Sequence, residues 1–91
     1  MYAVVVTATI ARGRRDEAAG MTESFAIPML KSQAGHVASY FTVGADGTSG
    51  LSISVFESKE QAEASAATVS PPADAPLSVK TVEVREVIAA G

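Results

Sequence analysis

The sequence predicts one α+β domain over residues 1–91, with the element order βαββαβ. An uncharged, β-branched segment at Tyr2–Ile10 precedes an amphipathic helical pattern. Two alternating segments, His36–Val43 and Leu51–Phe56, flank a loop rich in glycine and aspartate. A second helix follows Ser58, and Val79–Ile88 supplies the last strand. This order is typical of a ferredoxin-like fold, a four-stranded antiparallel sheet with both helices on one face.

The first strand is expected at the centre of the sheet. Its alternation sets Val4, Val6 and Ile10 on one face and Val5, Thr7 and Thr9 on the other. Both faces lack charge and are rich in β-branched residues, which indicates that both are covered in the folded protein.

The first helix is expected from about Arg15 to Gln33. Spacings of three and four give it one apolar stripe, made of Ala18, Met21, Phe25 and Met29. Pro28 removes a helix hydrogen bond, so we expect a kink or break there. Ile27 and Leu30 lie off the stripe, so either a break turns Leu30 inward or the two residues meet a partner. Gly35 is expected to end the helix as a left-handed cap.

The second helix carries a sequence signature at its start. Ser58 and Gln61 match a capping box, in which each residue's side chain bonds the other's backbone N–H. Small apolar residues follow, so the helix is expected to lie close to the sheet. The last strand mixes charged and apolar residues, which favours an edge position.

Composition indicates a soluble, cytoplasmic homodimer. Hydrophobic residues make up 47% of the chain, which is a large share for a domain of 91 residues. Two helices cover one sheet face only, and the surplus suggests that a second copy covers the other. The net charge of −3 argues against a nucleic-acid partner, and no apolar run is long enough to span a membrane.

Three stretches carry a resemblance to a known superfamily: Gly35–Tyr40, Gly44–Thr48 and Ser52–Ser65, the last including Phe-Glu-Ser-Lys-Glu-Gln-Ala-Glu-Ala-Ser. They resemble the dimeric α+β barrel superfamily, in its antibiotic biosynthesis monooxygenase-like branch. The resemblance implies a homodimer whose sheets pack face to face into a barrel. It also implies a pocket between helices and sheet in each protomer.

The superfamily includes cofactor-independent oxygenases, haem-degrading enzymes and lactone isomerases, so the fold alone does not assign the activity. Its oxygenases use Asn and Trp with a Tyr, Arg or His partner, and this sequence has neither Asn nor Trp. No catalytic residue is therefore carried over. The absence of Cys, Asn and Trp together with a single His predicts no haem degradation, no metal dependence and no bound cofactor.

His36 and Tyr40 are the first candidate ligand-binding pair, because strand alternation places them on one face. His36 is a candidate general base, since its ordinary pKa lies near neutrality. Met21, Phe25 and Met29 are candidates for an apolar pocket wall facing them. The alternatives remain open: a partly exposed His at the start of a strand, and ordinary core packing of the three apolar residues.

Charged residues give weaker candidates. Arg12, Arg14 and Arg15 lie beside a helix N-terminus, where they hold an acidic ligand or form a solvated loop. Glu57, Glu60 and Glu63 surround the second helix start and are best explained by capping and solubility.

Two functions are consistent with these observations. The first is a cofactor-independent, monooxygenase-like enzyme acting on a small aromatic or polyketide-like molecule. The alternative is a non-catalytic, ligand-binding or stress-associated protein of the same fold. An open cavity facing His36 and Tyr40 favours the enzyme, and a volume filled by Met and Phe side chains favours the second reading.

Overall fold

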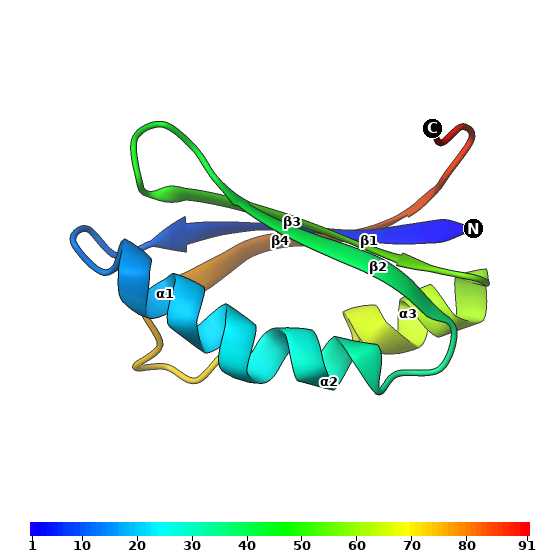
Figure 1. Cartoon of the computed structure of the whole chain (residues 1–91), viewed down its shortest axis with the longest axis horizontal. Coiled ribbons are helices and arrows are strands. Elements are labelled where there is room, and N and C mark those ends of the chain that lie inside the picture. The colour runs from blue at the N-terminus through cyan, green and yellow to red at the C-terminus, as the bar shows by residue number, and fades with distance from the viewer.

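The computed structural model describes residues 1–91 as one antiparallel sheet covered by helices (Figure 1). The strand order is β2-β3-β1-β4. The strands are β1 (Tyr2–Ile10), β2 (His36–Val43), β3 (Ser49–Phe56) and β4 (Leu77–Glu86). The helical segments are α1 (Arg15–Met21), a π-helical turn (Thr22–Ala26), α2 (Ile27–Lys31) and α3 (Lys59–Ala66). The predicted α+β class and element order are confirmed.

All helices lie on one face of the sheet, and the opposite face is left open (Figure 1). The strand β1 is central and β4 is an edge strand, as predicted. Val4 and Ile10 of β1 are buried on the side that the helices cover. No helix is both long enough and apolar enough to cross a membrane.

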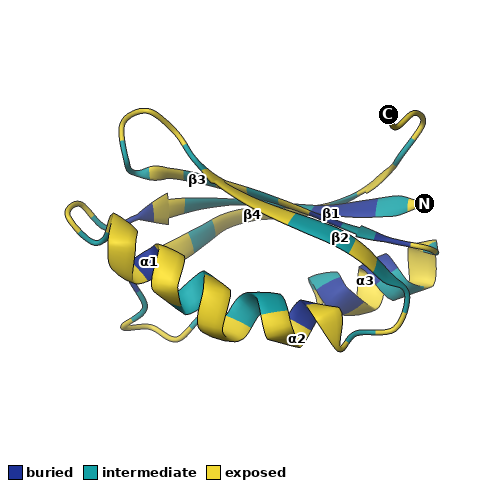
Figure 2. Ribbon diagram, in the orientation of Figure 1, coloured by how far each residue is buried: buried dark blue, intermediate teal, exposed yellow.

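The hydrophobic core occupies only part of the space between sheet and helices. Val4, Leu30, Phe56 and Ala62 form one buried cluster where α2 and α3 pack on the sheet. Only 10 of 91 residues are buried, so most apolar side chains keep some exposure (Figure 2). The half of the sheet that faces α1 is therefore packed less tightly.

The π-helical turn changes which residues of the first helix face the sheet. In a regular α-helix, Met29 lies about 20° and Leu30 about 120° around the axis from Ala18. The turn absorbs one extra residue, because the Ile27 N–H bonds the Thr22 carbonyl five residues back. Leu30 therefore moves to about 20° from Ala18. Ala18 and Leu30 are buried, whereas Met29 is 46% exposed.

The end of the helix differs from the prediction in two ways. The helix passes through Pro28 without a break, because the π-helical turn directly before it has already shifted the hydrogen-bond pattern. It ends at Lys31, so Gly35 is not its cap. Gly35 does adopt a left-handed conformation with φ of 78°, but it lies in the turn that enters β2.

A β-bulge at the start of β2 sets the orientation of its side chains. His36 pairs with Phe56 and Ala38 pairs with Val55, so Val37 is an extra residue in the strand. From Ser39 onward, pairing is regular, with Ser39 opposite Ser54. The bulge therefore brings His36 and Ser39 to the same face, three residues apart.

The predicted capping box opens α3. Gln61 N–H donates to Ser58 Oγ, and Ser58 N–H donates to Gln61 Oε1, both at 3.2 Å. Ala62 and Ser65 are buried against the sheet. Their small side chains allow the close approach that the sequence predicted.

Candidate functional site: a cavity between the first helix and the sheet

A cavity of about 780 Å³ lies between the first helix and the sheet. Its floor comes from the covered sheet face, including Val6 and Ile10 of β1. Its other walls come from α1, the π-helical turn and the segment that leads into β4, including Pro71 and Pro72. Cavities of roughly 300–1,000 Å³ hold drug-sized molecules, so this one is large enough for a multi-ring compound.

The cavity exists because the covered face of the sheet is unevenly filled. Strand β3 turns its serines Ser52 and Ser54 toward the helices, while Leu51 and Ile53 point to the open face. Ala8 of β1 and Gly50 of β3 lie beside each other on the covered face, and they are also small. Small side chains on the floor leave the space that large ones fill in a packed core.

The three predicted wall residues Met21, Phe25 and Met29 all line the cavity. Phe25 is 72% exposed, so core packing within the chain does not explain it. The π-helical turn is the cause, because it turns Ala26 toward the sheet in place of Phe25. Phe25 and Met29 lie at the rim, where apolar side chains remain available for contact.

The prediction that His36 and Tyr40 share a face is wrong. The bulge at Val37 reverses the alternation, so His36 lies on the covered face and Tyr40 on the open one. His36 packs edge-on against the buried Phe56 ring, with ring centroids 5.6 Å apart. Tyr40 is 65% exposed and does not line the cavity.

The bulge instead joins His36 to two serines that the sequence analysis did not single out. His36 Nε2 lies 2.7 Å from Ser39 Oγ, and Ser39 Oγ donates to Ser54 Oγ at 2.9 Å. Ser54 is 5% exposed and lines the cavity. Serines on the covered face of β3 were the available signal, because serine is uncommon at fully buried positions.

The direction of these hydrogen bonds defines what Ser54 offers to a ligand. Ser39 donates its one hydroxyl hydrogen to Ser54, and in the Nε2–H tautomer of its ring His36 donates to Ser39. The hydroxyl hydrogen of Ser54 has no acceptor in the protein. Ser54 can therefore donate to a ligand oxygen, in a site whose other walls are mainly apolar.

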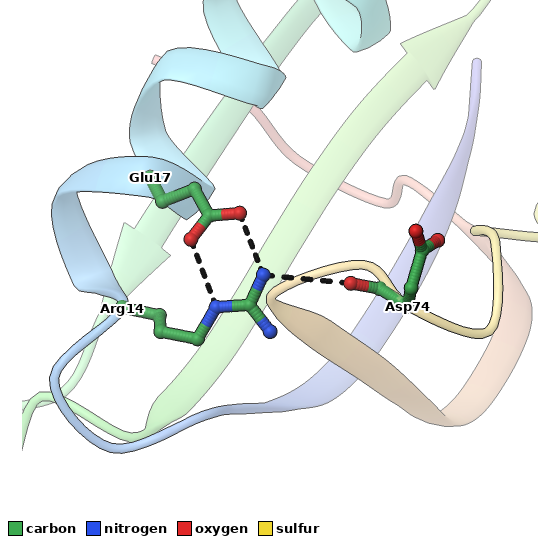
Figure 3. Close-up of polar contacts among 3 residues, drawn as sticks. All are labelled: Arg14, Glu17 and Asp74. Atoms are coloured by element: carbon green, nitrogen blue, oxygen red, sulfur yellow. Dashed lines mark hydrogen bonds and ion pairs between the residues drawn. The ribbon is translucent and has the colours of Figure 1, made fainter.

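Arg14 of the predicted arginine cluster is engaged within the protein (Figure 3). Arg14 forms a two-pronged pair with Glu17, with N–O distances of 2.8 and 2.6 Å. These hydrogen bonds raise the pKa of Arg14 and lower the pKa of Glu17. Arg14 also donates to the Asp74 carbonyl at 3.4 Å, which ties the loop before β4 to the start of α1.

The other charged candidates do not converge on the cavity. Arg15 lines one end of it and pairs with Asp16 at 3.3 Å. Glu57, Glu60 and Glu63 are exposed and make no ion pair. No group of three or more His, Cys, Asp or Glu side chains has the arrangement of a metal site.

Comparison with known proteins identifies the fold. No protein-family model and no curated protein sequence matches the chain. A solved structure does: a monooxygenase from the gene ActVA-Orf6 of Streptomyces coelicolor, crystallised in complex with the ligand nanaomycin D. The match covers 99% of this chain and 92% of that one, with a TM-score of 0.59 and 15% sequence identity.

This chain shares the α+β fold of that monooxygenase. The likeness extends over almost the whole of both chains, which includes both helices and all four strands. At 15% identity it establishes the fold and not the reaction.

Proposed function

We propose that the chain forms a homodimer in which each protomer binds a small aromatic or polyketide-like molecule in the cavity. We further propose that it oxidises this molecule as a cofactor-independent monooxygenase. The observation that carries the proposal is the cavity of about 780 Å³, with mainly apolar walls and the unpaired hydroxyl hydrogen of Ser54. A planar ligand with one oxygen substituent matches that combination of a large apolar surface and few polar groups.

The structural neighbour supports the ligand class. That monooxygenase was crystallised with nanaomycin D bound, and its fold matches this chain over 99% of the sequence. The adaptable apolar side chains at the cavity rim, Met21, Phe25 and Met29, suit a ring system.

The proposed reaction requires no external reductant. A phenolic ring that is oxidised to a quinone gives up two hydrogens and gains one oxygen. Dioxygen supplies both oxygens of the products: one becomes the new carbonyl, and the other leaves as water. The substrate itself provides the electrons, and the protein contributes binding, orientation and exclusion of water.

The open sheet face supports the homodimer. Tyr40, Leu51 and Ile53 are exposed apolar residues on this face, which no helix covers. Exposed apolar patches of this kind mark association surfaces, and two twisted sheets can pack face to face. A second copy presents a matching apolar face.

A non-catalytic binding protein is the second candidate. It is favoured by the absence of Asn and Trp from the chain and by a cavity whose buried polar groups are hydroxyls alone. Both candidates require ligand binding, and only the first requires consumption of dioxygen.

The test measures binding and oxidation separately. Binding of nanaomycin D to the purified protein is followed by calorimetry, and oxidation of α-naphthol to naphthoquinone is followed by oxygen uptake. We expect saturable binding and one molecule of dioxygen consumed for each quinone formed. Binding without oxygen uptake would favour the second candidate, and absence of binding would overturn both.

A variant that fills the cavity controls for adsorption to the surface. Ala8 faces the cavity from β1, so Ala8→Phe is expected to weaken binding at least about tenfold. Ala64→Phe places the same ring on the exposed side of α3, away from the cavity, and is expected to bind as the wild type does. Equal affinity in the two variants would contradict binding in this cavity.

A further inference from the structure

We propose that Ser54, Ser39 and His36 form a proton relay between the cavity and solvent, through which His36 takes up the proton of a ligand hydroxyl. The inference rests on the proposed small-molecule site and adds the group that ionises the ligand. The three residues come from two paired strands, and the bulge at Val37 brings them into line.

The geometry forms an unbroken path. Ser54 lines the cavity, its Oγ lies 2.9 Å from Ser39 Oγ, and that atom lies 2.7 Å from His36 Nε2. Both distances are those of ordinary hydrogen bonds along which a proton can pass. His36 itself does not line the cavity, so it acts on a ligand only through the serines.

The far end of the path reaches solvent. His36 is half-buried, and its Nδ1 has no hydrogen-bond partner in the protein. Gln33 Oε1 is the only buried side-chain nitrogen or oxygen atom without a hydrogen-bond partner. The unpaired Nδ1 of His36 is therefore not buried. Nδ1 therefore exchanges protons with water, while Nε2 faces the serine chain.

The chain works in either direction because each serine both donates and accepts. With His36 donating Nε2–H, Ser54 donates to a ligand carbonyl. With His36 protonated on Nδ1 alone, Nε2 accepts from Ser39, Ser39 accepts from Ser54, and Ser54 accepts from a ligand hydroxyl. Proton transfer along the chain reverses the direction of every hydrogen bond and so converts one arrangement into the other.

Proton uptake by the relay is balanced. The ligand O–H bond breaks and its proton moves to Ser54 Oγ. The Ser54 proton moves to Ser39, and the Ser39 proton moves to His36 Nε2. The products are a ligand oxyanion and an imidazolium, which can return one proton to solvent through Nδ1. An ionised phenol is the electron-rich form that reacts with oxidants.

Few charged groups lie near His36. The strand β2 packs against β3 and α2. Strand β3 has no titratable side chain, α2 has only the exposed Lys31, and Tyr40 of β2 is on the opposite face. No ion pair or charged hydrogen bond reaches His36. The serine chain is thus its main polar contact.

The first measurement uses the ligand-free protein. Nitrogen NMR of the His36 ring reports which nitrogen carries the proton. We expect Nε2–H to predominate in the wild type, and Ser39→Ala and Ser54→Ala to reduce this preference. Ser39→Thr keeps the hydroxyl and is expected to restore it. Ser78→Ala removes an exposed strand serine that is not part of the Ser54–Ser39–His36 relay, and it is expected to have no effect. If Ser54→Ala leaves the preference for Nε2–H in the His36 ring unchanged, the coupled relay is overturned.

The second measurement uses alizarin, a hydroxyanthraquinone dye whose phenol and phenolate absorb differently. The phenolate fraction of the bound dye is expected to fall about tenfold in Ser39→Ala and in His36→Gln. Gln donates to Ser39 but takes up no proton, so His36→Gln separates hydrogen bonding from proton acceptance. A loss in Ser54→Ala alone would show a direct hydrogen bond and overturn the relay. If neither the wild type nor any variant binds the dye, the result counts against the proposed function. The nitrogen NMR measurement on the ligand-free protein would still test whether the three residues are coupled.

Discussion

Gly35 lies in the turn before β2, where its φ of 78° is strained for any residue with a side chain. A Cβ at this position would lie 1.8 Å from Gln61 Oε1, the atom that completes the capping box of α3. A methyl group added at Gly35 would therefore disturb both the turn and the cap of α3.

Gly35→Ala is expected to destabilise the protein by about 2–3 kcal/mol, because it adds backbone strain and displaces the helix cap. Gly47→Ala is the matched control, since Gly47 has φ of 75° and nothing within 4 Å of an added Cβ. It should cost about 1–2 kcal/mol, the strain alone. Urea unfolding of both variants gives the comparison, and equal losses would contradict the coupling.

Asp46 organises the loop between β2 and β3. Its carboxylate accepts hydrogen bonds from the backbone N–H groups of Thr48 and Ser49 and from the Ser49 hydroxyl. These bonds lower the pKa of Asp46 to about 2, from an ordinary 3.8. The exposed loop is thus built around an ionised side chain.

A folded-state pKa below the unfolded value gives stability that is present above the unfolded pKa and lost as pH falls. The contribution of Asp46 is therefore expected to be full above pH 4 and to disappear toward pH 2. The protection factors of the Thr48 and Ser49 amides, which divide the intrinsic exchange rate at each pH by the observed rate, should fall over that range. Asp46→Ala should show little protection of these amides at any pH, and a constant protection factor in the wild type would contradict this account.

At the scale of the elements, the first helix separates a buried side from a cavity rim. Leu30 is buried in the core, whereas Phe25 is 72% exposed and lines the cavity. The two side chains therefore have different consequences when they are truncated.

Phe25→Ala is expected to change stability by less than about 1 kcal/mol, because surface substitutions have small effects. It should weaken nanaomycin D binding several-fold, since it removes apolar contact from the cavity rim. Leu30→Ala is the reciprocal variant and should cost about 2–5 kcal/mol of stability. Thermal unfolding and calorimetry measure both quantities. A loss of 3–5 kcal/mol in Phe25→Ala would indicate a core residue instead.

The order and nature of the elements could be predicted from the sequence, and so could the α3 capping box and the presence of Met21, Phe25 and Met29 beside the cavity. The face of its element to which each side chain points could not be predicted. Reasoning from a period of 3.6 selected Phe25 and Met29 for the buried face, and a period of 2 paired His36 with Tyr40. One extra residue in the π-helical turn and one in the β-bulge displaced both patterns.

These insertions leave little trace in the sequence, because each preserves the apolar and polar composition of its element. They are determined by tertiary packing: Leu30 fills the core beside Phe56, and His36 packs on the Phe56 ring. The serine chain was missed for the same reason, since without the bulge His36 and Ser39 fall on opposite faces.

At the scale of the whole molecule, the open sheet face makes the oligomeric state testable. Ile53 lies on β3, toward the middle of that face, and is exposed in the single chain. A charge there would be buried without a partner in a sheet-to-sheet dimer, which is strongly unfavourable.

Sedimentation of the wild type is expected to give about twice the 9.3 kDa chain mass. Ile53→Asp should sediment as a monomer with its fold retained by circular dichroism. Ile88→Asp makes the same change beyond the end of β4, at a side chain that is 92% exposed, and should remain dimeric. A monomeric wild type would exclude the barrel arrangement.

Strand β3 gives the two surfaces of the molecule separate sets of residues. Leu51 and Ile53 project to the open face, and Ser52 and Ser54 project to the cavity. Alternate positions on a strand share a backbone but no side-chain environment. Substitutions at the serines can therefore reshape the cavity while the apolar residues of the open face stay constant. The same independence lets an engineer change the lining of the cavity without altering the open face.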